Sequence, residues 1–193
     1  MERGEDMESN ALGDTFKHKV VSKRTVDCLG HELLSFVRLL KYNTGQNWSI
    51  EDLLTKTHRL FFLYLDEKCD PEYEYFELAG VMAVRSDYRR AETVFNKAQY
   101  ELPKGIFIGF YNEWSLLTIA SSYRDKGYSK LLRDEVDIMT KHKYHHIYSV
   151  VEVDNLKVNR TNARYGFKKV GLPFTQDDSD KVFELFLKEV KND

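Results

Sequence analysis

The sequence contains 193 residues, a length typical of one globular domain. Hydrophobic residues make up 42% and charged residues 31%, which excludes a disordered or fibrous chain. The 29 lysines and arginines nearly balance the 31 aspartates and glutamates, so the net charge of −2 gives no support for nucleic-acid binding. The longest apolar run, Leu60 to Leu65, is far shorter than the ~20 residues of a membrane helix. We therefore expect neither a nucleic acid nor a membrane as partner.

Residues 1–14 are acidic and have little to bury, so we expect a loose N-terminal tail before one domain over residues 15–193. The N-terminus lacks the apolar segment of a signal peptide. Two cysteines, Cys28 and Cys69, do not suffice to cross-link a chain of this size. These features favour a cytoplasmic protein with reduced thiols.

The first half of the domain alternates short apolar segments with helical patterns. A short strand is expected over 16–24. Apolar residues at helical spacing then predict a helix from Val26 to about Asn43. A second helix is expected to begin at Ser49, because Ser49 and Asp52 have the spacing of a helix cap. Two strands follow, over 60–65 and 76–84.

The second half continues the alternation. The run from Ile147 to Val153 is almost continuously apolar, as expected of a central strand covered on both faces. The remaining segments are assigned in the same way: a helix over 90–100, an apolar segment over 106–110, a strand over 113–120, a helix over 128–139, a helix over 155–165 and strands over 167–171 and 181–188. The whole pattern is that of a mixed α/β domain.

The most informative segment runs from Ser115 to Leu132, where a strand leads through a tight turn into a helix. The turn reads Arg124-x-x-Gly127-x-Ser129, and its small residues leave the backbone exposed. Successive amides at a helix start can bind one anion, which indicates a phosphate or pyrophosphate site. A plain strand–turn–helix junction is the alternative. The turn lacks the glycine and lysine pattern of a nucleoside-triphosphate P-loop.

A second segment lies some 25 residues further on, where an apolar strand ends at Asn155, a helix follows, and the chain reaches Gly166-Phe167. Together the two segments resemble the GNAT superfamily, the Gcn5-related N-acetyltransferases that use acetyl-CoA. The first is similar to the acyl-CoA loop R/Q-x-x-G-x-G/A, with Ser129 in the last place. The second is similar to the motif N-x-x-(A/S)…G-F. The resemblance covers Glu113 to Gly171 most clearly, about a third of the chain.

The resemblance implies a single domain whose central sheet is mixed and mostly antiparallel, with one parallel, splayed strand pair, flanked by helices. It implies transfer of an acetyl group from acetyl-CoA to a primary amine, by direct attack in a ternary complex and without a metal. The acceptor is a small-molecule or protein amine, and a homodimer stays open. A GNAT-fold module that binds acyl-CoA or a protein partner with little or no turnover is the alternative.

The resemblance also assigns binding residues. Ile119 and Ala120 would pair with the pantetheine arm, and Asn155 would contact it unless it serves only as a helix cap. Arg124 and Lys126 would add charge near the phosphates, with solvated surface charge as the alternative. The pyrophosphate would lie on the backbone amides of five residues: Asp125, Lys126, Gly127, Tyr128 and Ser129.

Amine acylation needs a base for the ammonium proton and an acid for the departing thiolate. Glu113, six residues before Ile119, has the position at which several family members place the base; an exposed Glu on an edge strand is the alternative. The usual acid is a Tyr on the last helix, but here that position holds Asn162, which can bond the sulfur and cannot serve as an acid. Tyr165 lies on another helix face, so the acid stays unassigned. His142, His145 and His146 lack the spacing of a known zinc site.

Overall fold

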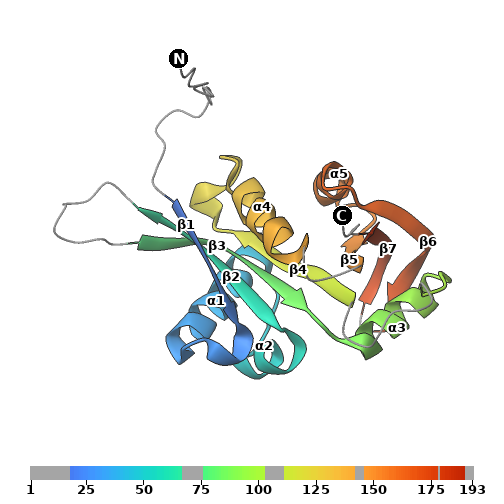
Figure 1. The fold of residues 1–193 in the computed structure, drawn as a ribbon, viewed down its shortest axis with the longest axis horizontal. Helices are drawn as coiled ribbons and strands as arrows, with labels where there is room; N and C mark the ends of the chain where they lie inside the picture. Colours follow the sequence, from blue (N-terminus) through green and yellow to red (C-terminus); the bar gives the residue numbers. More distant parts are fainter. Residues whose placement is uncertain (1–17, 67–75, 103–110, 142–145, 178, 190–193) are drawn as a thin grey trace, which may run out of the picture.

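A computed structural model describes residues 18–66, 76–102, 111–141, 146–177 and 179–189. Within these ranges, seven strands form one sheet in the order β1-β2-β3-β4-β5-β7-β6 (Figure 1). Neighbouring strands are antiparallel, except that β4 and β5 are parallel. The predicted α/β class and the mixed, mostly antiparallel sheet are confirmed. The N-terminal tail predicted over 1–14 and the apolar segment at 106–110 lie outside the described residues.

Each strand overlaps a segment predicted as a strand, and β6 continues for five residues beyond the predicted end at Gly171. The bounds are β1 His18–Arg24, β2 Arg59–Asp66, β3 Phe76–Arg85, β4 Tyr111–Ile119, β5 His146–Glu152, β6 Lys168–Gln176 and β7 Ser179–Glu189. The helices are α1 Gly30–Thr44, α2 Ile50–Lys56, α3 Tyr88–Lys97, α4 Tyr128–Lys141 and α5 Leu156–Arg164. No helix in the described part of the chain is long and apolar enough to cross a bilayer.

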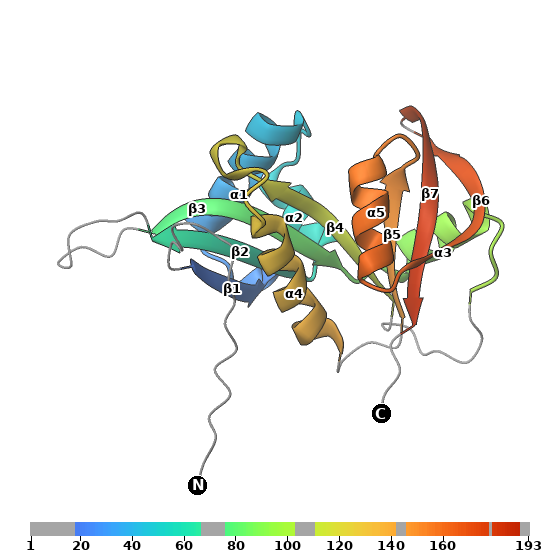
Figure 2. The ribbon, with the colours of Figure 1, turned by 90° about the horizontal axis from the view of Figure 1, so that it is seen from above.

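The helices cover both faces of the sheet. Helices α4 and α5 lie on one face, and α1, α2 and α3 lie on the other (Figure 2). Side chains alternate between these faces along β2: Phe61 and Leu63 belong to the core beneath α4, whereas Leu60 and Phe62 belong to the core beneath α1 and α2. Because both faces are buried, the strand reads as one continuous apolar run.

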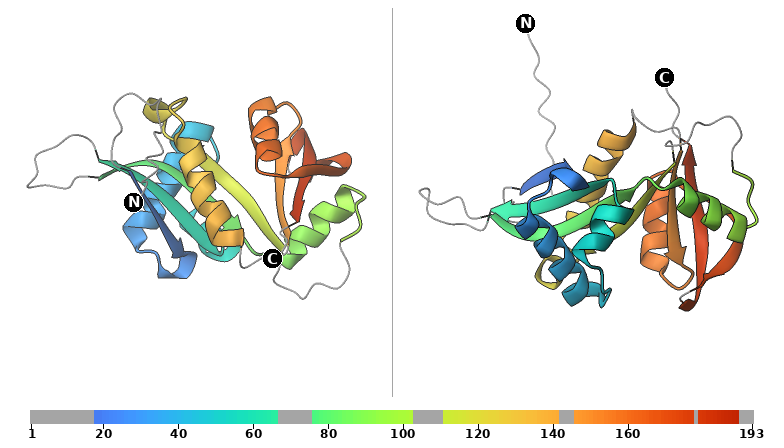
Figure 3. Two further views of the ribbon diagram at one scale, coloured as in Figure 1. Left: turned by 45° about the horizontal axis from the view of Figure 1, so that its top comes forward. Right: turned by 90° about the horizontal axis from the view of Figure 1, so that it is seen from below.

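Strands β4 and β5 touch only at their first residues. The parallel register comprises three pairs, Tyr111↔His146, Asn112↔Ile147 and Glu113↔Tyr148, after which the two strands diverge (Figure 3, left). Beyond this seam β4 carries a bulge at Leu116, whose φ is +56°. The splayed parallel pair is therefore present, and it opens a space between two strands of one sheet.

Two helices differ from their predicted bounds. The first begins at Gly30 and not at Val26, because Thr25–Asp27 form a separate 3-10 turn and the next two residues, Cys28 and Leu29, have extended backbone conformations. The third ends at Lys97 and not at Tyr100, since Gln99 has a φ of +50°.

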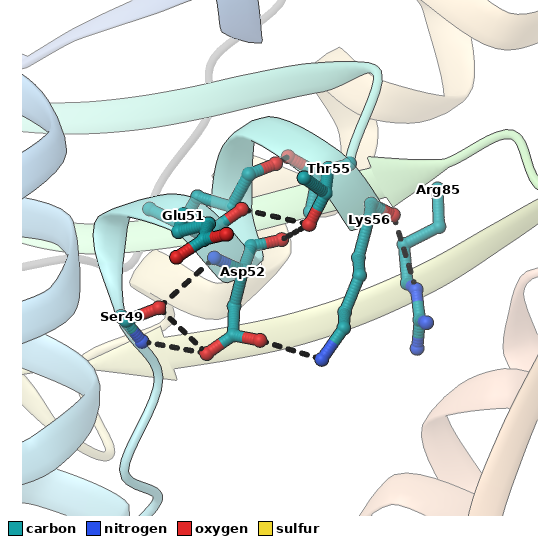
Figure 4. Close-up of polar contacts among 8 residues, drawn as sticks. Ser49, Glu51, Asp52, Thr55, Lys56 and Arg85 are labelled. Carbon is teal, nitrogen blue, oxygen red and sulfur yellow. Dashed lines mark hydrogen bonds and ion pairs between the residues drawn. The ribbon is translucent and has the colours of Figure 1, made fainter.

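The predicted start of the second helix is confirmed. The Ser49 hydroxyl accepts from Asp52 N (3.0 Å), and the Asp52 carboxylate accepts from Ser49 N (2.9 Å) (Figure 4). This reciprocal pair satisfies amides that the first helical turn leaves free.

Candidate active site

Two adjoining cavities lie near the turn 124–129. The larger of the two has a volume of about 840 Å³ and lies between the start of α4 and the helix α5. Leu117 and Ile119 of β4 contribute to its wall. The side chains that line this cavity carry an excess of positive charge. Two are carboxylates, Asp125 and Asp134, and six are cationic, namely Arg124, Lys130, Arg133, Lys157, Arg160 and Arg164. Such an excess of positive charge attracts polyanions.

The turn 124–129 forms one end of this cavity. Asp125 and Gly127 both have left-handed backbone conformations, with φ of +61° and +83°. Among the described residues, none accepts a hydrogen bond from the amides of residues 125–129. The next amide, Lys130 N, donates to Gly127 O (2.9 Å). The amides of residues 125–129 are thus free at the start of α4, where the helix dipole favours an anion.

Two charged side chains of the turn join it to other elements. Arg124 Nη2 donates to Asn43 O (2.8 Å) and Arg124 Nε donates to Ile119 O (3.2 Å), so this guanidinium connects the turn to the end of α1. The Asp125 carboxylate accepts from Lys157 Nζ (2.6 Å), which connects the turn to α5. Lys126 does not line the cavity, and its Nζ lies 5.6 Å from the centre of the Tyr123 ring.

The other predicted binding residues are divided between the two cavities and the sheet. Ile119, Tyr128 and Ser129 line the larger cavity with the turn. Ala120 lines neither cavity, and its amide donates to Ala79 O (2.8 Å) within the sheet. Asn155 caps α5 by accepting from Val158 N (3.2 Å), and it lines the second cavity as well. Its contact to a ligand stays a prediction.

The second cavity, of about 210 Å³, lies where β4 and β5 diverge. Residues 114–118 of β4 and 149–152 of β5 form its two sides. Three residues line both cavities, namely Leu117, Arg133 and Val158. The two cavities therefore adjoin along the space between the splayed strands.

Asn162 and Arg133 lie at this junction and are both buried, with 1% and 4% of their surface exposed. Arg133 Nη1 donates to Asn162 Oδ1 (3.0 Å), whereas Arg133 Nε and Asn162 Nδ2 have no acceptor. Each buried, unpaired donor costs about 1–3 kcal/mol, which a ligand oxygen would recover. Arg133 was not among the residues predicted from the sequence. Its position on α4, three residues before the buried Val136 and seven before the buried Thr140, places it on the buried face of the helix, and this spacing could have identified it.

Glu113 is buried, with 4% of its surface exposed, so it is not an exposed edge-strand residue. Its Oε2 lies 3.4 Å from Arg85 Nη1 and 3.4 Å from Arg90 Nε. It belongs to the closed end of the β4–β5 seam and lines neither cavity. The structure thus separates Glu113 from Asn162 and the turn, and its role as the base stays a prediction.

Tyr165 lines the larger cavity, and its hydroxyl donates to Asp134 Oδ1 (2.7 Å). Burial, followed by the bond to Asp134, raises the pKa of this phenol well above its ordinary value. A phenol that holds its proton so firmly is a poor general acid.

The histidines give no support for a metal site. His142 and His145 lie outside the described residues, and His146 is the first residue of β5. Within the part of the chain that the structure describes, no three metal-ligating side chains come together.

Neither a protein-family model nor the sequence of a curated protein matches this chain. Solved structures do match, and they share the GNAT fold. NAA60 of Arabidopsis thaliana, solved with acetyl-CoA, superposes with a TM-score of 0.67 at 14% identity, over 89% of this chain and 100% of that one. The ribosomal-protein-S18-alanine N-acetyltransferase of Escherichia coli gives 0.61 at 9% identity, over 92% and 96%. A GNAT family acetyltransferase of Elizabethkingia anophelis with bound acetyl-CoA gives 0.54 at 13% identity, over 89% and 97%.

These similarities establish the class of fold: the chain has the fold of the GNAT acetyltransferases, as the two sequence segments predicted. At 9–14% identity they show the fold alone.

Proposed function

We propose that the chain is an acyl-CoA-dependent N-acyltransferase that transfers an acetyl group from acetyl-CoA to a primary amine. The observation that carries this proposal is the cationic cavity of about 840 Å³ at the turn 124–129. Free amides, a helix start and six cationic side chains suit the phosphates of CoA, and the adjoining gap between β4 and β5 suits its narrow pantetheine arm.

The reaction forms a C–N bond and breaks the thioester C–S bond, whose electron pair leaves on sulfur. The chain's own contribution is to hold the reactants and to stabilise charge. The turn 124–129 binds the phosphates, Ile119 lies beside the arm, and Asn162 presents a buried N–H donor to the reacting thioester. Donors fixed in a poorly solvated site stabilise developing negative charge more strongly than water does.

In this proposal the amine is acylated directly in a ternary complex, in the cytoplasm and without a metal. Glu113 assists removal of the ammonium proton, and the thiolate leaves without a tyrosine acid. The acceptor is a small-molecule amine or a protein amine. The E. coli neighbour is an N-acetyltransferase of ribosomal protein S18 alanine, so this fold accommodates a protein amine.

A second candidate is a module that binds acyl-CoA or a protein partner without turnover. Two observations favour it: Asn162 stands where the family has a tyrosine acid, and Glu113 pairs with two guanidinium groups and lines neither cavity. A thiol-release assay over a panel of amines separates the candidates, because only the enzyme releases CoA in an amine-dependent way.

Calorimetric titration with acetyl-CoA of the Gly127→Glu variant tests the binding site. No atom lies within 4 Å of a Cβ added at Gly127, so the side chain meets no clash, and its carboxylate adds a negative charge at the turn that we propose binds the phosphates. We expect affinity to fall by at least about tenfold, or ~1.4 kcal/mol. Gly127→Ala is the matched control, because it has the same left-handed backbone at φ +83° without the charge. Unchanged affinity in Gly127→Glu would remove this turn from the binding site.

A further inference from the structure

Arg133 is a buried cation that has no anionic partner among the residues the structure describes. Only 4% of its surface is exposed, and among the described residues no carboxylate lies within 4.0 Å of its guanidinium. Its contacts are the hydrogen bond from Nη1 to Asn162 Oδ1 (3.0 Å) and the ring of Tyr165, whose centre lies 5.8 Å away. Burial lowers the pKa of this guanidinium to about 10, so it is still charged at neutral pH. A buried charge ordinarily has a partner, which indicates that a ligand supplies one here.

Three carboxylates line the two cavities, and all of them have partners. Asp125 is paired with Lys157. Asp134 accepts from Lys130 Nζ (2.6 Å) and from the Tyr165 hydroxyl (2.7 Å). Glu152 of the second cavity accepts from Lys181 Nζ (2.8 Å). None of the three is available to neutralise Arg133.

The hydrogen-bonding groups that the second cavity leaves unsatisfied are mostly donors. Four buried groups lining it have no partner: Trp114 Nε1, Thr118 Oγ1, Arg133 Nε and Asn162 Nδ2. Three of these are N–H donors and the fourth is a hydroxyl that can donate. An acceptor-rich ligand is the complement of such a lining.

The guanidinium nitrogens of Arg133 that are not bonded to Asn162 indicate which acceptor group of a ligand fits them. Since Nη1 is bonded to Asn162, the edge formed by Nε and Nη2 is left, and its two parallel N–H groups match a carboxylate. Arg133 Nε and Asn162 Nδ2 are both buried, so binding of a carboxylate requires the guanidinium and the Asn162 amide to turn toward the cavity.

We propose that Arg133, oriented by Asn162, binds a carboxylate carried by one of the two substrates at the junction of the cavities. This inference rests on the proposed function and names a substrate class for it. The carboxylate belongs to a dicarboxylic acyl group on CoA or to an amine acceptor that is an amino acid. A volume of about 210 Å³ suits a group of this small size.

The first experiment compares malonyl-CoA with isovaleryl-CoA by calorimetry. The two acyl groups have nearly the same shape, and only malonyl carries a carboxylate. If the carboxylate is on the acyl group, the wild type binds malonyl-CoA at least about tenfold more tightly than isovaleryl-CoA, and Arg133→Met binds the two esters equally. Arg164→Met is the matched control: it removes an exposed cation of the larger cavity and weakens both esters alike.

The second experiment tests the acceptor as the source. The protein is saturated with CoA, and its thermal shift is measured with a panel of free amino acids and the corresponding amino acid amides. A larger shift for the acids, lost in Arg133→Met, assigns the carboxylate to the acceptor. Arg133→Lys, which keeps the charge and loses the paired N–H edge, recovers part of the preference.

The wild-type comparisons need no variant, so a folding defect in Arg133→Met leaves the inference testable. Binding of acetyl-CoA with no carboxylate preference in either experiment overturns this inference and leaves the proposed function intact. Absence of binding by every CoA ester overturns the proposed function, and the inference with it. A loss of turnover in Arg133→Met with an unchanged carboxylate preference also overturns it, since Arg133 then acts on the reacting thioester.

Discussion

Glu113 and Asn162 were both assigned from the family pattern, and the structure gives them different surroundings. Asn162 lies at the junction of the two cavities, next to the buried Arg133. Glu113 lies at the closed end of the β4–β5 seam, between Arg85 and Arg90. A motif fixes a position on a strand or helix. It does not fix the partners that the rest of the fold brings to that position, and these partners decide the chemistry.

The Glu113→Gln variant tests whether this carboxylate acts as the base. The neutral amide no longer pairs with the two guanidinium groups, so we expect a loss of about 1–3 kcal/mol in the free energy of unfolding. If Glu113 also takes the amine proton, kcat/KM falls at neutral pH and recovers as the pH approaches the pKa of the amine, because the free amine then needs no base. The measurements are denaturant unfolding and a pH–rate profile.

Arg90→Gln is the control for this variant, because it breaks the same ion pair and keeps the carboxylate. Both variants lose stability, and only Glu113→Gln changes the pH profile. A profile like that of the wild type in Glu113→Gln would assign the carboxylate a purely structural role.

Substitutions of Asn162 test the missing acid. Asn162→Ala removes the proposed hydrogen bond from Asn162 to the ligand, worth about 1 kcal/mol, so we expect the rate to fall by less than tenfold. It also removes the acceptor of Arg133 Nη1, so we expect a loss of about 1–3 kcal/mol in the free energy of unfolding. Asn162→Tyr restores the family residue at a position that is 1% exposed, and crowding there costs about 1–3 kcal/mol of stability with no gain in rate. Single-turnover kinetics measure the rates. A large loss of rate with Asn162→Ala, or a clear gain with Asn162→Tyr, would show that the side chain at this position contributes more to catalysis than one hydrogen bond, contrary to our proposal.

At the scale of elements, much of the fold was predictable from local patterns. The reciprocal spacing of Ser49 and Asp52 located the start of α2, because the chemistry of a helix cap lies within four residues. The apolar run of β5 indicated a strand covered on two sides, and the run of β2 indicated a strand. The signals that place a helix or strand are short-range, so the sequence retains them.

Two features of the site could not be predicted in this way. The bulge at Leu116, with φ of +56°, has no glycine or asparagine to mark it, and it follows from the pairing of β4 with β3. The burial of Arg133 depends on α5, which is distant in sequence and brings Asn162 against it. Both features arise from long-range packing, and both lie where the cavities meet.

The cap of α2 makes a pH-dependent contribution to stability. Asp52 accepts from Lys56 and Ser49, and these bonds lower the pKa of its carboxyl below the ordinary value (Figure 4). A lowered folded-state pKa gives stability that is complete above the unfolded pKa of about 3.9 and is lost as the pH falls below it. We therefore expect Asp52→Asn to lower Tm at pH 7 and the difference from the wild type to shrink toward pH 2.

Glu51→Gln provides the comparison, because it makes the same charge change in the same helical turn without these bonds. Its Tm stays near that of the wild type. If Asp52→Asn and Glu51→Gln shift Tm equally at pH 7, the reciprocal cap is not the source of the stability.

At the scale of the molecule, the sheet consists of two parts joined by a short seam. Helices α1, α2 and α4 lie over strands β1–β4, and helices α3 and α5 lie over strands β5–β7 (Figures 1 and 2), while the core cluster beneath α4 continues across the seam to Ile147 and Phe186. The registered contact between β4 and β5 spans three residue pairs. Both cavities lie along the diverging part of this pair, so a ligand there contacts α4 from one part and α5 from the other.

Acetyl-CoA should for this reason stabilise the molecule as a whole. At a free concentration of 100 times Kd, a ligand of the folded state adds about 2.7 kcal/mol to the free energy of unfolding. For a domain of this size that raises Tm by roughly 5–10 °C. S-acetylpantetheine, which lacks the phosphates, gives little shift at the same concentration if the cationic cavity supplies the affinity, and added salt reduces the shift with acetyl-CoA. Equal shifts with both ligands would mean that the turn 124–129 and the six cationic side chains do not bind the phosphates.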